Sequence, residues 1–211
     1  MPYDPERHHR RSIRLRGYDY TRDGAYFVTL CVRDRVCLFG EVVNGAVRLS
    51  AAGRIVAEAW TWLAVQYPYV ALDAWVVMPN HLHGIIVMGD GDGLGGGGGG
   101  SRTARTGDAA GRPGDAAGRP GDAAGRPGDA AGRRGPVQRK PLGRLIGAFK
   151  TVSTKRINEI RGTPGAVLWQ RNYYEHVIRD TADLRRIRAY IAANPARWGW
   201  DWNNPLPGPH T

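Results

Sequence analysis

The sequence predicts an α+β fold in which helices cover one face of a mainly antiparallel sheet. Apolar runs of strand length and segments with helical spacing of apolar residues follow one another in the order β, β, α, β, β, α, β, α. A segment rich in glycine lies between the fourth β run and the second helical segment and holds 18 of the 30 glycines. Because a flexible insertion is cheap to close into a loop, the segments on either side of it are expected to meet as one domain.

The part before the glycine-rich segment contains four expected β segments and one helix. The β segments are rich in β-branched and aromatic residues and cover residues 26–32, 42–49, 70–77 and 83–88. An Asn44-Gly45 pair within the second segment suits a tight hairpin turn. Ser50 is a good N-terminal cap for a helix over residues 51–66, where apolar residues recur at helical spacing.

The part after the glycine-rich segment is expected to contain two helices with a strand between them. Apolar residues at helical spacing predict the first helix over residues 142–161, before a Gly-Thr-Pro stop. Residues 173–178 read as a short strand. The last helix is expected to begin at Thr181 and to end near Asn194-Pro195.

Composition divides the chain into one domain and three segments without a core. Residues 107–134 are four repeats of GDAAGRP or a close variant, and the Gly and Pro in each repeat disfavour a helix. We therefore expect a basic arm over residues 1–16, one domain over residues 17–88 and 141–200, a low-complexity linker over residues 89–140, and a tail over residues 201–211.

Charge favours a polyanionic partner. Lys and Arg number 30 against 19 Asp and Glu, which gives a net charge of +11. Without an apolar run long enough to span a membrane, or a signal peptide, we expect a cytoplasmic protein with no membrane partner. Candidate DNA contacts are basic residues of the last two helices and one tyrosine that could stack on a base: Lys150, Lys155, Arg156, Arg185, Arg186, Arg188 and Tyr174.

The most informative motif is His81-Leu82-His83. Residues i and i+2 of an extended segment point to the same side, so both imidazoles are expected to project together while Leu82 points into the core. Two imidazoles side by side form a partial metal site. The alternative is a pair of unrelated surface histidines.

Residues 78–84, with the sequence MPNHLHG, resemble the histidine-hydrophobic-histidine motif of HUH single-tyrosine nucleases. Residues 24–29 (GAYFVT), residues 169–176 (WQRNYYEH) and the segment from Tyr190 to Asn194-Pro195 extend the likeness. In this order the blocks resemble the REP-associated tyrosine transposases. The resemblance implies a ferredoxin-like sandwich and metal-dependent cleavage and rejoining of single-stranded DNA beside a palindromic hairpin.

Tyr190 is the expected nucleophile, and Asn194 is the expected third metal ligand beside His81 and His83. The two residues are one helical turn apart, so one helix delivers both, as the resemblance also implies. A half-buried structural tyrosine and a polar residue that ends the helix are the alternatives. Tyr173 and Tyr174 are the rival nucleophiles, and His176 is left out of the metal set.

These residues predict a metal-dependent DNA endonuclease and strand transferase that acts through a 5′-phosphotyrosine. Nitrogen and oxygen ligands suit Mg²⁺ or Mn²⁺, with zinc as an alternative. The alternative functions are a catalytically inactive nucleic-acid-binding protein of the same fold and a metal-dependent phosphohydrolase. The partner is expected to be single-stranded or hairpin DNA, and the protein a monomer or a homodimer.

Overall fold

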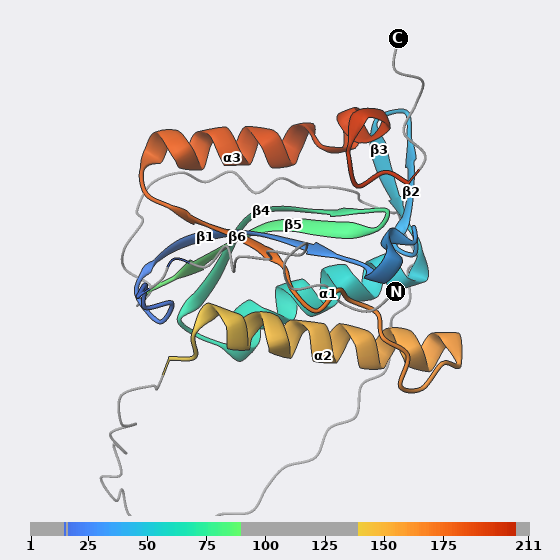
Figure 1. Cartoon of the computed structure of the whole chain (residues 1–211), viewed down its shortest axis with the longest axis horizontal. Helices are drawn as coiled ribbons and strands as arrows, with labels where there is room; N and C mark the ends of the chain where they lie inside the picture. The colour runs from blue at the N-terminus through green and yellow to red at the C-terminus, as the bar shows by residue number, and fades with distance from the viewer. Residues whose placement is uncertain (1–14, 16, 90–138, 206–211) are drawn as a thin grey trace, which may run out of the picture. The chain divides into compact units, whose positions relative to one another are not determined.

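The elements follow the predicted order along the chain (Figure 1). A computed structural model describes residues 15, 17–89 and 139–205, which all belong to one compact unit. The predicted arm apart from Leu15, the linker from residue 90 to 138 and the tail from residue 206 lie outside the described residues. The elements are β1 (Gly24–Cys31), η1 (Arg33–Arg35), β2 (Gly40–Val43), β3 (Ala46–Leu49), α1 (Ala51–Gln66), β4 (Val70–Met78), β5 (His81–Met88), α2 (Leu142–Arg161), β6 (Tyr174–Ile178), α3 (Thr181–Ala193) and η2 (Pro195–Trp200).

The main sheet has four strands in the order β4-β5-β1-β6, and all neighbouring strands are antiparallel. The succession β1-α1-β4-β5-α2-β6 is the βαββαβ arrangement of a ferredoxin-like fold, which confirms the predicted fold class. Strands β2 and β3 form a separate hairpin. Its turn is the predicted Asn44-Gly45 pair, whose φ angles of 50° and 74° suit a tight turn of the mirror-image type.

Helices α1 and α2 cover one face of this sheet. Ser50 caps α1 as expected, because its hydroxyl oxygen accepts a hydrogen bond of 3.1 Å from the Gly53 amide. Trp60 of α1 is fully buried and contacts Phe149 of α2 edge-on, with ring centroids 5.3 Å apart. In the described part of the chain, no helix combines the length and the apolar character needed to cross a membrane.

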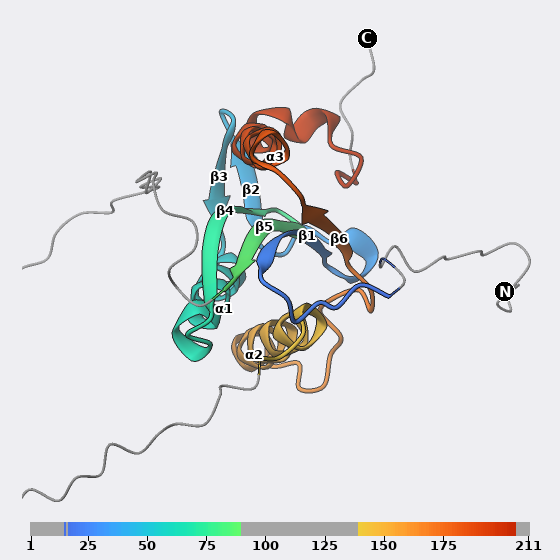
Figure 2. The ribbon, with the colours of Figure 1, turned by 90° about the vertical axis from the view of Figure 1, so that its left-hand side faces the viewer.

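Helix α3 corrects the prediction that the helices share one face, because it lies on the opposite side of the sheet (Figure 2). In β1, Tyr26 and Val28 point into the core under α1 and α2, whereas Phe27 points to the other side and packs with Ile187 and Ile191 of α3. Apolar side chains alternate on both sides of the central strands, so both faces need a cover. Helix α3 supplies the second cover over part of the sheet.

Candidate active site

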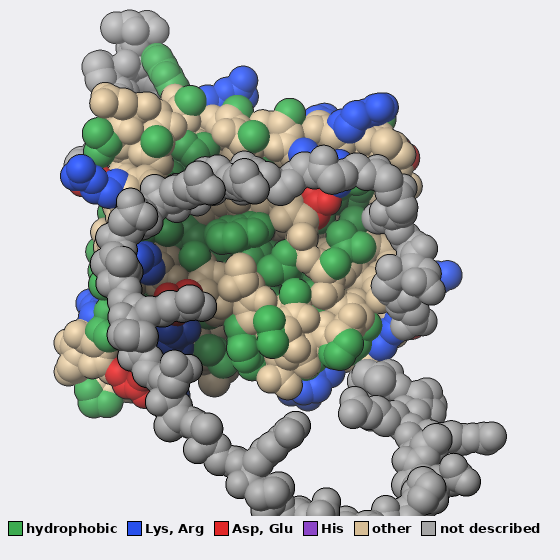
Figure 3. Space-filling model, turned by 180° about the vertical axis from the view of Figure 1, so that it is seen from behind, with side chains coloured by type: hydrophobic (Ala, Val, Ile, Leu, Met, Phe, Trp, Pro, Cys, Tyr) green, Lys and Arg blue, Asp and Glu red, His purple; other side chains and the backbone are tan. Residues whose placement is uncertain are grey.

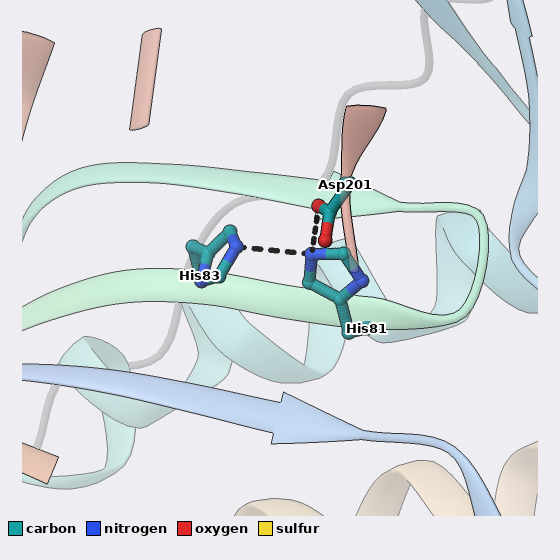
Figure 4. A group of neighbouring side chains, drawn as sticks. All are labelled: His81, His83 and Asp201. Atoms are coloured by element: carbon teal, nitrogen blue, oxygen red, sulfur yellow. Dashed lines mark hydrogen bonds and ion pairs between the residues drawn. The ribbon is translucent and has the colours of Figure 1, made fainter. Parts of the chain in front are cut away.

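The two histidines of the motif lie at the start of the central strand β5, on the side of the sheet that faces α3. His81 is opposite Cys31 of β1 and His83 is opposite Thr29, while Leu82 is fully buried in the core under the other helices. The Nε2 atoms of the two rings are 3.0 Å apart (Figure 4). The predicted geometry, two imidazoles on one side close enough to share an ion, is confirmed.

Asn80 fixes the orientation of the His81 ring. Its side-chain nitrogen donates two hydrogen bonds of 2.8 Å, to the carbonyl oxygens of Arg35 and Asn203. The Asn80 side-chain oxygen must therefore be the atom 2.8 Å from His81 Nδ1, so Nδ1 carries a proton and donates it. In the neutral ring the lone pair then lies on Nε2, the atom that faces His83.

Both histidines are held neutral by burial. Burial, together with the nearby Arg35 guanidinium, lowers the pKa of His81 to about 3. Burial, and next the His81 ring, lower the pKa of His83 to about 3, although Asp201 and a hydrogen bond with Asn194 oppose the shift. Thr29 Oγ1 lies 2.8 Å from His83 Nδ1 and orients that ring. Neutral imidazoles with oriented rings are suited to bind a cation.

Asp201 joins the histidines and was not predicted. One of its carboxylate oxygens, Oδ2, is buried 3.6 Å from His81 Nε2 and has no hydrogen-bond partner among the described residues. The ligand atoms of His81, His83 and Asp201 all lie within 4.8 Å of one another. The sequence prediction ends the domain at residue 200, but Asn203 is buried and accepts from Asn80, which holds this segment against the site. No spacing in the sequence links Asp201 to a motif 118 residues earlier, so only the fold reveals it.

Tyr190 lies on α3 directly above the histidine pair. Its hydroxyl is 3.4 Å from His83 Nε2, and its ring meets the rings of His83 and Phe27 at centroid distances of 5.2 Å and 6.0 Å. Tyr190 itself is partly open to solvent, with 42% of the residue exposed. Two residues earlier, the Arg188 guanidinium pairs with Asp73 of β4 at 2.7 Å, which ties the helix to the sheet.

Asn194 follows one turn after Tyr190 and is buried. Its side-chain nitrogen lies 3.3 Å from the backbone oxygen of Tyr190, to which it donates. The Asn194 side chain also raises the pKa of His83, against the lowering by burial. Asn194 is therefore close to the histidine pair, as the i, i+4 spacing leads one to expect.

The rival tyrosines lie apart from the histidine pair. Tyr174 is 48% exposed and packs edge-on against Phe27 at 6.1 Å, on the same side of the sheet as the histidines. Tyr173 is half-buried and lies beside the Lys150 ammonium, 5.5 Å from its ring centre. His176 is hydrogen-bonded to Asp183 at 2.7 Å, which supports leaving it out of the metal set.

The candidate DNA contacts are scattered, and most already have partners. Lys150, Lys155 and Arg156 belong to α2, on the face of the sheet opposite to the histidines, so they do not lie beside the histidine pair. Four of the six basic residues are engaged in contacts within the protein: Lys150 with the Gln170 carbonyl, Arg156 with Glu58, Arg186 with Asp183, and Arg188 with Asp73. In the view from behind, apolar side chains gather in the middle of the face, and Lys and Arg lie mainly towards its margins (Figure 3).

Comparison with known proteins gives one relative of the whole chain. An uncharacterized protein of Haemophilus influenzae is 32% identical over 202 residues, covering 94% of this chain and 95% of that protein. The chain belongs to the family of this Haemophilus protein. No model of a protein family matches the chain.

Two solved structures are similar to this chain. A REP-associated tyrosine transposase bound to a REP hairpin is similar with a TM-score of 0.51 and 19% identity, covering 90% of this chain and 76% of that one. A candidate transposase of Deinococcus radiodurans has a TM-score of only 0.37 and 13% identity, covering 85% and 95%. The first likeness establishes a shared fold, so this chain has a transposase-like fold.

In this chain, His81, His83 and Asp201 together fit a divalent cation. A buried carboxylate oxygen without a hydrogen bond to any described residue faces two buried, neutral imidazoles, an arrangement that is costly unless a cation or a proton bridges the groups. Two imidazole nitrogens beside a carboxylate oxygen suit Zn²⁺ or Mn²⁺ better than Mg²⁺, which prefers oxygen donors and water. A tyrosine hydroxyl at the edge of such a site is placed for nucleophilic chemistry.

Proposed function

We propose that the protein is a metal-dependent endonuclease and strand transferase that cleaves single-stranded DNA through Tyr190. One observation carries the proposal: the hydroxyl of the partly exposed Tyr190 lies 3.4 Å from His83 in a buried, neutral histidine pair that also faces a buried carboxylate. The transposase of the same fold is bound to a hairpin, and hairpin-flanked single-stranded DNA is the substrate class proposed here. One copy of the chain brings together the tyrosine, the two histidines and the carboxylate.

The proposed metal ligands are His81, His83 and Asp201, with Asn194 next to them. A bound Mn²⁺ or Mg²⁺ would neutralise charge on the scissile phosphate and favour ionisation of the nearby phenol. Asn80 and Thr29 orient the two imidazoles, so these residues act by positioning.

The chain's own groups account for the covalent step. The Tyr190 oxygen attacks the phosphorus and forms a new P–O bond, while the bond to the 3′ oxygen breaks. The phenol proton leaves to solvent, to which Tyr190 is open, and the departing 3′ oxygen takes up a proton. The product is a 5′-phosphotyrosine and a free 3′ hydroxyl. Because a phosphodiester link is retained, attack by another 3′ hydroxyl reverses the step and rejoins DNA without ATP.

The test is covalent capture of DNA. A 5′-labelled and a 3′-labelled hairpin oligonucleotide with single-stranded tails are incubated with protein and Mn²⁺, then separated on a denaturing protein gel. The proposal expects only the label on the 3′ side of the cut to migrate with the protein, and Tyr190→Phe to abolish this band without loss of folding. Cleavage without any covalent band would indicate a phosphohydrolase, and DNA binding without cleavage would indicate an inactive binding protein.

A further inference from the structure

A pocket lies at the same end of the sheet as the histidine pair. It has a volume of about 600 Å³ and lies between the loop after β1 and the segment before β6. The backbone joins it to the site: the Val32 amide donates to the Asn80 carbonyl on one side, and the Gln170 amide donates to the Cys31 carbonyl on the other. His81 and Gln170 therefore lie on either side of β1, about two strand spacings or roughly 10 Å apart.

The charge of this pocket is positive. Arg33, Arg35 and Arg171 line it together with a single acidic residue, Asp34. Arg171 is exposed and forms no ion pair with any described residue. The Arg33 contact with Asp34 is long, at 3.6 Å, and both side chains are well exposed, so it holds the guanidinium only weakly. Two guanidinium groups are thus available for an anion.

The loop that carries the arginines has an unusual backbone. Asp34 and Arg35 both have left-handed φ angles, 59° and 55°, although neither is glycine. This backbone conformation is unfavourable for residues with a side chain, and strained backbone of this kind clusters at functional sites. Hydrogen bonds of 2.8 Å hold the loop, from the Arg33 amide to the Leu168 carbonyl and from Asn80 to the Arg35 carbonyl. Asn80 thereby joins this loop to His81.

The remaining lining suits a base better than an isolated anion. Val167 is 60% exposed, and the buried Trp169 lies at the pocket wall, so part of the lining is apolar. Asn172 is exposed at the rim and offers an amide that can both donate to and accept from a base edge. Guanidinium groups beside an apolar surface and an amide match the phosphate and base of an unpaired nucleotide.

We infer that this pocket binds an unpaired nucleotide of the DNA strand that adjoins the cleaved phosphodiester, with Arg33 and Arg171 on its phosphate. The inference rests on the proposed function in one respect: the path of the DNA strand from this pocket to His81 and Tyr190 assumes that cleavage takes place there. Arg35 is held by Trp202, on whose ring it stacks at 4.4 Å, and it shapes the pocket.

The test measures binding alone, in Tyr190→Phe protein with EDTA, by fluorescence anisotropy of a labelled mixed-sequence single strand and of the matching blunt duplex. Arg33→Ala/Arg171→Ala is compared with Arg144→Ala/Arg179→Ala, which removes the same charge from exposed positions outside the pocket. The pocket variant is expected to bind the single strand at least about tenfold more weakly. The slope of the logarithm of the binding constant against the logarithm of the salt concentration should become shallower by roughly 0.7 for each phosphate that the protein no longer neutralises. The control variant should bind the single strand almost as tightly as the parent protein does. Binding of the duplex should weaken much less than binding of the single strand in the pocket variant.

Three results would overturn the inference: equal weakening in the two double variants, weakening as large for the duplex as for the single strand, or no weakening. Because Arg33 and Arg171 are both exposed, their replacement is not expected to disturb folding. The single variant Arg171→Glu should also bind the single strand more weakly, with an unchanged thermal midpoint. The outcome is separate from that of the proposed function. Pocket-dependent binding without covalent capture would refute only the cleavage chemistry, and capture without pocket dependence would refute only the pocket.

Discussion

Asn80 is the residue that links the histidine pair, the strained loop and the C-terminal segment. Its side chain contacts His81, the Arg35 carbonyl and the Asn203 carbonyl. Replacing Asn80 with Ala removes the group that fixes the His81 ring and leaves two carbonyl oxygens without this donor. We expect Mn²⁺ affinity, measured by calorimetry, to fall about 10- to 100-fold.

Ser153→Ala is the matched control for Asn80→Ala. It also removes buried hydrogen bonds, from Trp169 and to the Phe149 carbonyl, but at a distance from the site. Both variants should lose roughly 1–3 kcal/mol of stability, and only Asn80→Ala should lose metal affinity. Equal Mn²⁺ affinities in the two variants would show that Asn80 does not position His81.

The buried histidines also make stability depend on pH. Their folded pKa values of about 3 lie below the ordinary value of 6.5, so the unfolded chain takes up protons first as the pH falls. The stabilisation is complete above about pH 6.5 and is lost as the pH falls towards 3, by up to roughly 1.4 kcal/mol per pH unit for each histidine. Urea unfolding of metal-free protein should show this slope, and His81→Gln/His83→Gln should flatten it. An unchanged slope in the double variant would mean that the histidines are not held neutral.

At the scale of the elements, α1 approaches the motif strand because Gly84 has no side chain. A Cβ atom at Gly84 would lie 2.4 Å from Trp60 Cζ2 of α1, whereas one at Gly147, in α2, would meet no atom within 4 Å. Gly84→Ala should therefore lower the free energy of unfolding by about 1–3 kcal/mol. Gly147→Ala should raise it by up to about 1 kcal/mol, because alanine favours a helix. Chemical denaturation tests this pair, and changes of the same sign would contradict the packing described.

Local sequence signals were sufficient for most elements and insufficient for their placement. The Ser50 cap and the Gly-Thr-Pro stop define α1 and α2 with the predicted bounds, because capping and periodicity act within a few residues. The face covered by α3 was predicted wrongly, since the apolar alternation in β1 shows that both faces need cover but does not identify the helix that covers each. Asp201 was missed for a related reason, because its approach to His81 depends on contacts between distant segments.

At the scale of the molecule, the two ends of the described chain that flank the low-complexity segment are both hydrogen-bonded to Tyr69. The Gly89 amide donates to the Tyr69 carbonyl, and the Lys140 amide donates to the Tyr69 hydroxyl. Because the two ends are held near each other, the length of the segment between them should matter little. Deleting residues 107–134 should leave the thermal midpoint and the rate of DNA cleavage nearly unchanged. Loss of folding would show that the repeats are needed for the stability of the domain.

The identity of the nucleophile is the central claim, and peptide mapping of the captured protein tests it most directly. The DNA-linked protein is digested with nuclease and trypsin, and the peptide that carries the residual nucleotide is sequenced by mass spectrometry. Cleavage after Arg188 and Arg197 gives a peptide in which Tyr190 is the only tyrosine, and cleavage after Arg171 and Arg179 gives one with Tyr173 and Tyr174. We expect the nucleotide on Tyr190 in the first peptide. A nucleotide on Tyr173 or Tyr174 in the second peptide would contradict the account.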